Sequence, residues 1–164
     1  MRFGMYRFSC ILNDTAVLPP YKGSTFRGVF GLSLKKVVCA LKHQECVSCL
    51  LRSKCLYSLV FEIAPLAPPA GPKKRIASPP HPYVIEPDTN EKQKYIAGEH
   101  FDFGLILFGE TNDYFPFFVY AIEQMGEIGI GKKVSGKRPR FSLVSVTTGD
   151  GRRVFSSEKR ALER

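Results

Sequence analysis

The order of apolar patterns along the chain constrains its fold more than any other feature of the sequence. Residues 2–13 alternate loosely and then run apolar, and residues 99–108 begin as strict alternation and end as a continuous apolar run, as strands do. Apolar side chains recur at helical spacing over residues 26–41, which predicts an amphipathic helix. Residues 111–129 predict a second, largely covered helix, and residues 140–146 predict a final strand.

Capping residues set the expected ends of the two helices. Ser24 is expected to cap the first helix, because its side-chain oxygen can accept a hydrogen bond from a first-turn N–H group. Thr111 or Asn112 is expected to cap the second helix, and Gly126 is expected to end it.

The middle of the chain has weaker patterns. The run "LYSLVFEI" (56–63) is short and β-prone. Proline dominates residues 65–87, which indicates an extended or polyproline loop because proline fixes φ and removes a donor. Within that loop, "PYVIEP" (82–87) is expected to add a short edge strand.

Together the patterns predict an α+β domain of the ferredoxin-like (RRM-like) β-α-β-β-α-β type over residues 1–148. A cysteine-rich insertion (39–55) and the proline-rich loop (65–87) interrupt it, and residues 149–164 are expected to form a basic tail or the start of a linker. The helices would cover one sheet face, and the other face would be open to a partner, as in four-stranded sheets that bind RNA.

The charge of the chain points to a polyanionic partner. The formal net charge is +9 and the isoelectric point is near 9.4, which favours nucleic acid first and an acidic membrane surface second. A basic domain without such a partner is the plain alternative. The sequence has no apolar run long enough to span a membrane and no signal-peptide pattern at its start, so we expect a cytoplasmic protein.

Four cysteines in the insertion suggest a metal site. Their spacing is C-x6-C-x2-C-x5-C, and four thiolates suit a structural, tetrahedral zinc ion. An iron–sulfur cluster has weaker support from the spacing, and reduced buried thiols or disulfides remain alternatives. Cys10 lies in the first strand and is expected to be a core thiol. The four candidate ligands are Cys39, Cys46, Cys49 and Cys55.

Glycines and cations gather in "GEIGIGKKVSGKRPRF" (126–141), between the second helix and the last strand. Glycines let a backbone approach phosphates and cations neutralise them, so this segment predicts an RNA contact, with a flexible basic hairpin as the alternative. Lys22 and Arg27, near the start of the first helix, are further candidates for phosphate contact. The residues expected to bind RNA in the segment are Gly129, Gly131, Lys132, Lys133, Lys137, Arg138 and Arg140.

Several segments, in order, resemble one protein family. They are "LPPYKGSTFRGVFGLSLKKVVC", "CVSCLLRSKCLYSLVFE", "PYVIEP", "FDFGLILFG" and "GEIGIGKKVSGKRPRFSLVSV". Over residues 15–148 the chain resembles the CRISPR-associated endoribonucleases that process precursor CRISPR RNA, in the repeat-associated mysterious protein (RAMP) superfamily.

The resemblance implies the amino-terminal half of a duplicated ferredoxin-like architecture that binds CRISPR repeat RNA, with other CRISPR-associated proteins as further partners. In that family cleavage needs no metal: a 2′-hydroxyl attacks the adjacent phosphate and leaves a 2′,3′-cyclic phosphate. One alternative is a non-catalytic RNA-binding subunit of a CRISPR ribonucleoprotein complex. Another is a zinc-stapled protein-interaction module.

The resemblance also implies catalytic candidates. In-line attack by a 2′-hydroxyl needs an acid, a base and a cation, and a catalytic histidine of the family often lies just beyond the first helix. His43 fits that place, and Lys42 beside it could supply charge. For His43, metal ligation and a solvated loop position are the alternatives. His81 and His100 are expected at the surface and at a strand end, where either could touch RNA.

Overall fold

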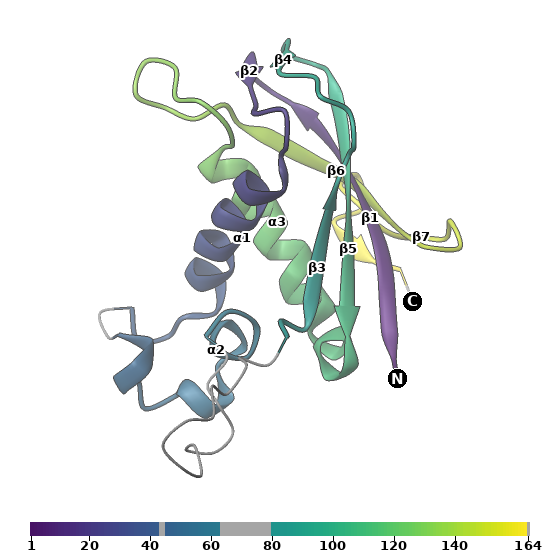
Figure 1. The fold of residues 1–164 in the computed structure, drawn as a ribbon. Helices are drawn as coiled ribbons and strands as arrows, with labels where there is room; N and C mark the ends of the chain where they lie inside the picture. The colour runs from purple at the N-terminus through teal and green to yellow at the C-terminus, as the bar shows by residue number, and fades with distance from the viewer. Residues whose placement is uncertain (43–44, 63–79, 164) are drawn as a thin grey trace, which may run out of the picture.

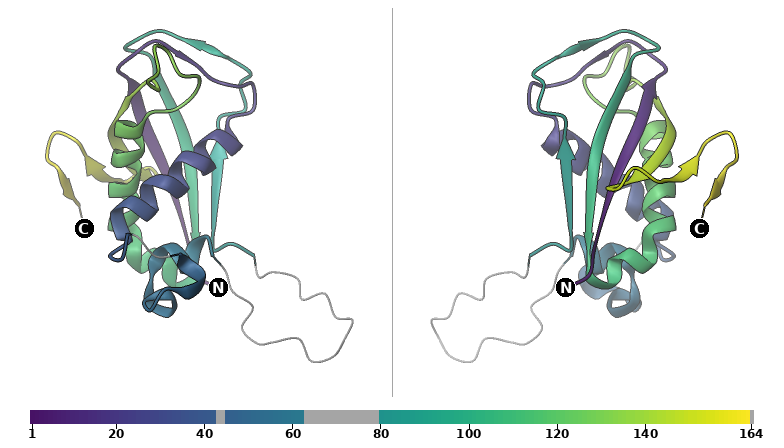
Figure 2. Two further views of the ribbon diagram at one scale, coloured as in Figure 1. Left: turned by 90° about the vertical axis from the view of Figure 1, so that its left-hand side faces the viewer. Right: turned by 90° about the vertical axis from the view of Figure 1, so that its right-hand side faces the viewer.

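The structure is a computed structural model that describes residues 1–42, 45–62 and 80–163. A six-stranded antiparallel sheet forms one layer, and the two long helices, α1 and α3, lie together on one of its faces (Figures 1 and 2). This is the predicted α+β class. Within the described ranges, no helix is both long and apolar enough to cross a lipid bilayer.

The central strand of the sheet is β1 (Phe3–Leu12), which pairs antiparallel with β5 (His100–Phe108) and with β6 (Phe141–Thr148). The strand order is β3-β5-β1-β6-β7-β8. The three outer strands are β3 (Tyr83–Pro87), β7 (Arg153–Ser156) and β8 (Ala161–Leu162). A second, two-stranded sheet pairs β2 (Ala16–Val17) with β4 (Lys94–Tyr95).

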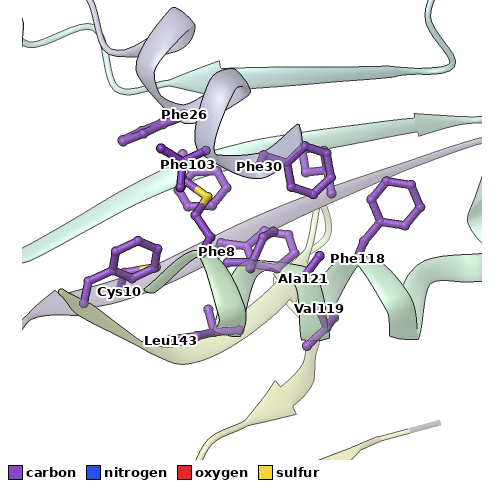
Figure 3. Close-up of a cluster of buried hydrophobic side chains, with 14 of the residues drawn as sticks. Phe8, Cys10, Phe26, Phe30, Phe103, Phe118, Val119, Ala121 and Leu143 are labelled. Atoms are coloured by element: carbon purple, nitrogen blue, oxygen red, sulfur yellow. The ribbon is translucent and has the colours of Figure 1, made fainter. Parts of the chain in front are cut away.

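The core lies between the sheet and the helices α1 (Gly23–Val38) and α3 (Phe115–Ile128). Phenylalanine rings from both layers fill it (Figure 3). Phe8 stacks on Phe103 with ring centroids 5.4 Å apart, and Phe30 of α1 stacks on Phe118 of α3 at 5.8 Å. Each such ring contributes about 2–3 kcal/mol by leaving water. Cys10 is fully buried among them, which confirms the predicted core thiol.

The strands predicted at residues 2–13, 99–108 and 140–146 are confirmed as β1, β5 and β6. The edge strand expected within "PYVIEP" is confirmed as β3, which pairs with β5 on one side and ends the sheet on the other. Alternation was a reliable guide here because each strand buries one face against the helices.

The predicted helix caps were wrong. Lys22 occupies the N-cap position of α1 and makes no side-chain capping bond, whereas Ser24 lies inside the helix. Gly126 also lies inside its helix, α3, where a Cβ would collide with the carbonyl oxygen of Phe141. Gly129, with φ of +89°, follows the last residue of α3 instead.

Thr111 and Asn112 do not cap α3 either. They belong to a 3-10 helix, η3 (Gly109–Tyr114), that precedes it. The hydroxyl of Thr111 donates to the Phe108 carbonyl at 2.6 Å, and the amide of Asn112 donates to the Leu107 carbonyl at 3.1 Å. Both side chains therefore complete the end of β5.

The β-prone run at residues 56–63 is a short helix, α2 (Leu56–Val60), so this prediction was also wrong. Leu56 and Val60 lie one turn apart and are both buried. Phe61, which follows, packs against Phe30 of α1 with ring centroids 5.7 Å apart. The conformation of this segment therefore follows from its packing against α1 and overrides the strand propensity of its residues.

Residues 149–164 were expected to form a basic tail or the start of a linker, but two strands within the described part of this segment continue the sheet. The strand β7 pairs with β6, and β8 pairs with β7. Val154 and Phe155 are buried, which gives the segment a core face that its charged sequence conceals. Of the proline-rich loop, residues 65–79 lie outside the described residues.

Candidate nucleic-acid interface

The glycine-rich segment forms a loop between α3 and β6, called here the cationic loop (residues 129–140). The backbone N–H of Lys132 donates to the carbonyl of Val17 at 3.0 Å, which fixes the base of the loop. Gly129 and Gly131 have φ of +89° and +84°, and a Cβ at either would collide with backbone carbonyl oxygens. The loop thus leaves the domain in a defined direction, and it carries Lys132, Lys133, Lys137, Arg138 and Arg140.

The tip of the cationic loop presents free positive charge. Val134 and Lys137 pair across a tight turn, with N–O distances of 2.8 and 3.1 Å. Lys132, Lys133 and Lys137 are exposed. Among the described residues, no carboxylate forms an ion pair with any of these three lysines.

The two arginines of the loop lie closer to the domain. Arg138 is half-buried. Arg140 is exposed, its guanidinium lies 3.8 Å from the carboxylate of Glu127, and its backbone N–H donates to Asp14 at 3.0 Å. An exposed ion pair at that distance contributes little to stability, so the guanidinium of Arg140 can leave Glu127 and bind a phosphate at little cost.

A hollow of about 380 Å³, the α1 groove, separates the cationic loop from the first turns of α1. Nothing lies within 4 Å of where a Cβ of Gly28 would be, so the helix surface is open there. Leu32 is 57% exposed beside it. An apolar floor with a cationic wall suits the bases and phosphates of a single strand. The groove is lined by Pro19, Ser24, Thr25, Gly28, Val29, Leu32, Gly131 and Arg138.

Arg27 lies on the other side of the first turn of α1, in a second hollow of about 340 Å³, the Arg27 pocket. Its guanidinium Nη2 lies 3.0 Å from Nε2 of His81. His81 Nδ1 lies 2.8 Å from the carbonyl oxygen of Val60. A carbonyl can only accept and a guanidinium can only donate, so His81 holds its proton on Nδ1 and presents a lone pair at Nε2.

Tyr83 lines the same pocket from β3. Its side chain is 94% buried, as 6% is exposed, and its hydroxyl has no hydrogen-bond partner among the described residues. Burial raises the pKa of Tyr83, and the Arg27 guanidinium works against that rise through its charge and through a hydrogen-bonding contact with the hydroxyl that is too poorly aligned to count as a full bond. Ser24 lines both the Arg27 pocket and the α1 groove, so the two hollows adjoin at the start of α1.

Lys22 does not face solvent. It is 2% exposed, and its ammonium donates to the carbonyl of Asn90 at 3.0 Å and to the side-chain oxygen of Asn90 at 3.3 Å. The group also lies 5.9 Å from the centroid of the Tyr95 ring. Lys22 therefore joins α1 to the β4 segment, and it is not placed to contact a phosphate.

The one catalytic candidate that the structure describes, Lys42, lies at the opposite end of α1 from the cationic loop. Lys42 is exposed in a turn beyond that helix, and His43 lies outside the described residues. With 16 residues, α1 separates this end from the cationic loop by about 24 Å. Figure 1 shows the loop projecting near the first turn of α1 and the cysteine segment at its other end.

The four cysteines follow α1 in two short 3-10 helices, η1 (Cys46–Ser48) and η2 (Arg52–Lys54), and in the turns around them. All four are partly buried free thiols. Cys46 lies beside Lys35 and raises the pKa of that lysine. Within the described ranges, no three His, Cys, Asp or Glu side chains form a group that could hold a metal ion. The structural zinc at these four cysteines stays a prediction from the sequence.

The sheet face opposite the helices was expected to be open to a partner. It contains a hollow of about 500 Å³ with an acidic wall, formed by Glu86, Asp88 and Asp102. Arg7, the one cation among the described residues that line it, pairs with Asp102 at 3.2 Å. Such a surface repels phosphates. On the helix side, by contrast, the cationic loop exposes Lys132, Lys133 and Lys137.

The sequence located the cationic loop but missed the Arg27 pocket. Glycine and lysine clusters are local signals, whereas Arg27 and His81 are 54 positions apart and meet only when β3 docks beside α1. The proline-flanked position of His81 was the one local hint. Tyr21, which also lines the pocket, carries no sequence signal of its own, and Ser24 was expected only as a helix cap.

A family model described as "AF_1859_N: N-terminal domain" matches residues 1–164. An uncharacterized protein of Archaeoglobus fulgidus is 26% identical over 142 residues, which is 86% of this chain and 45% of that protein. The chain thus spans about half the length of the curated relative that it matches.

Among solved structures, the fold is similar to a chain in the "Csm3-Csm4 subcomplex in the type III-A CRISPR-Cas interference complex". The TM-score is 0.52 and the sequence identity is 12%, with 88% of this chain and 76% of that chain covered. At this identity the likeness shows a shared fold.

Proposed function

We propose that this chain, which belongs to the AF_1859_N family of N-terminal domains, binds single-stranded RNA along the cationic loop and the α1 groove. The observation that carries the proposal is the set of three exposed lysines of the cationic loop, which make no ion pair within the described part of the chain and lie beside an apolar groove. Cations neutralise the phosphates, and the groove accepts the bases.

We further propose that the fold is ferredoxin-like. The long elements follow the chain order β1-α1-β3-β5-α3-β6, and their strands lie in the order β3-β5-β1-β6. In this arrangement β5 separates β1 from β3, as expected of a split βαβ unit. The fold shared with the Csm3–Csm4 subcomplex chain supports a place for this chain in the RAMP superfamily and in a cytoplasmic CRISPR ribonucleoprotein, with CRISPR repeat RNA and CRISPR-associated proteins as partners.

The finer proposal is precursor CRISPR RNA cleavage without a metal, with His43 and Lys42 as the catalytic candidates. Its support is the family resemblance. A second candidate, a non-catalytic RNA-binding subunit, is favoured by the likeness to a subcomplex of an interference complex. A repeat RNA with a single 2′-deoxy substitution at the scissile nucleotide separates the two, because it blocks cleavage by 2′-hydroxyl attack and leaves binding intact.

RNA binding is tested with a charge-neutralised loop. The variant carries Lys132→Gln, Lys133→Gln and Lys137→Gln, and its matched control carries Lys36→Gln, Lys54→Gln and Lys159→Gln at exposed sites away from the loop. We expect the loop variant to lose about tenfold or more of the affinity for a CRISPR repeat RNA, and the control to lose much less. Equal losses in both variants would contradict the proposed interface.

A further inference from the structure

The Arg27 pocket has the features of a binding site. Besides Arg27, it contains the exposed hydroxyl of Ser24, the Nε2 lone pair of His81 and the ring of Tyr21, which is 69% exposed. Its volume of about 340 Å³ lies in the range of small-ligand sites. The pocket also adjoins the α1 groove through Ser24, so a strand lying in the groove can extend into it.

Two observations point to an anionic group in the pocket. The first turn of α1 has no acidic residue and no side-chain cap, so its N–H groups remain available. The guanidinium of Arg27 lies beside the buried hydroxyl of Tyr83 without a well-aligned hydrogen bond to it, so it keeps donors for a ligand. Arg27 also adds a full positive charge to the pocket.

A base fits the remaining walls. The ring of Tyr21 lies against Gly23, where a Cβ would collide with it, and this largely exposed residue lines the hollow. Val84 of β3, 43% exposed, adds an apolar wall. Aromatic stacking of this kind accepts any base.

Resting on the proposed RNA binding, we propose that the Arg27 pocket is a single-nucleotide subsite that distinguishes RNA from DNA. Arg27 turns from His81 to the phosphate, the base stacks on Tyr21, and the freed Nε2 lone pair of His81 accepts a hydrogen bond from the ribose 2′-hydroxyl. A deoxyribose offers no such donor. The subsite therefore recognises the ribose, whereas the cationic loop contacts only the phosphates and does not distinguish RNA from DNA.

Two histidine variants isolate the Nε2 acceptor. In His81→Asn the side-chain amide can still donate to the Val60 carbonyl from the place of Nδ1, but nothing occupies the place of Nε2. In His81→Gln the amide oxygen can occupy the place of Nε2. We measure the affinity of each full-length variant for a short dye-labelled single-stranded RNA and for the DNA of the same sequence, and we check folding by thermal unfolding.

The native chain is expected to prefer RNA by about fivefold to tenfold, the effect of one hydrogen bond. In His81→Asn the ratio of RNA to DNA affinity should fall to about one, whereas His81→Gln should keep most of it. An unchanged ratio in a folded His81→Asn chain would overturn the proposal, and so would equal ratios in the two variants.

Two further variants test the phosphate and the base. Arg27→Gln should weaken RNA and DNA binding together and lower the salt slope by about 0.7, the loss of one phosphate contact to a single strand. Lys36→Gln, on the same helix outside the pocket, should change both the affinity and the salt slope much less. Tyr21→Leu should weaken RNA and DNA binding by about fivefold or more. Binding that depends on the loop lysines but on none of these pocket residues would overturn the subsite and leave the proposed function standing. No RNA binding by the native chain would overturn both.

Discussion

At the scale of single residues, position in the fold decides what a side chain does. Lys22 and Arg27 both lie in the first turns of α1, yet Lys22 is buried against Asn90 and Arg27 lines a pocket. Gly126 and Gly28 are both inside helices, yet the first touches the backbone of β6 and the second faces open space. Neither contrast is visible in the local sequence.

Replacing Lys22 tests its structural role. Lys22→Met keeps the apolar stem and removes the ammonium, which leaves the Asn90 carbonyl without its donor. We expect the free energy of unfolding to fall by about 1–3 kcal/mol, against less than about 0.5 kcal/mol for the exposed Lys36→Met. Denaturant unfolding measures both. A Lys22→Met chain of native stability with strongly reduced RNA affinity would show that Lys22 contacts RNA after all.

Alanine substitutions at the two helix glycines should change the free energy of unfolding in opposite directions. Gly126→Ala brings a Cβ onto the Phe141 carbonyl and should lower the free energy of unfolding by about 1–3 kcal/mol. Gly28→Ala meets nothing within 4 Å and should raise it by about 0.5–1 kcal/mol. Thermal or denaturant unfolding measures the change in each variant. Destabilisation of similar size at both positions would contradict the packing of α3 against β6.

At the scale of elements, sequence patterns correctly predicted the strands and helices that bury one regular face in the core. Alternation identified β1, β5 and β6, and helical periodicity identified α1 and α3, because each packs one face on the shared core. The same rules failed for α2, β7 and η3. These segments are short, and contacts with distant parts of the chain decide their conformation.

The cysteine segment gives an element-scale prediction. As arranged, its four thiols are partly exposed and free, whereas burial raises the pKa of the Cys10 thiol and keeps it unreactive. In reduced native protein we expect a disulfide reagent to modify four thiols readily and the fifth only on unfolding. The structural zinc proposed from the sequence would require the segment to close around the ion. About one bound zinc per chain, with four thiols protected until a chelator is added, would support zinc and contradict this arrangement.

At the scale of the whole molecule, charge is segregated between two surfaces. A hollow on the open sheet face is lined by three carboxylates and one paired arginine, whereas the cationic loop lies with the helices, so the loop is the better-placed surface for a polyanionic partner. Composition predicted a polyanionic partner and the local cluster predicted the loop. The expected use of the open sheet face could not be corrected from the sequence, because Glu86, Asp88 and Asp102 come together only through the pairing of β3 with β5.

The most direct test of the account is the salt dependence of RNA binding by the native chain and by the loop variant with Lys132, Lys133 and Lys137 replaced by glutamine. Each lost phosphate contact to a single strand lowers the slope of log K against log salt by about 0.7. The account predicts a slope smaller by about two in the loop variant, and a nearly unchanged slope in the control with Lys36, Lys54 and Lys159 replaced. A slope that is the same in the native chain and the loop variant would contradict it.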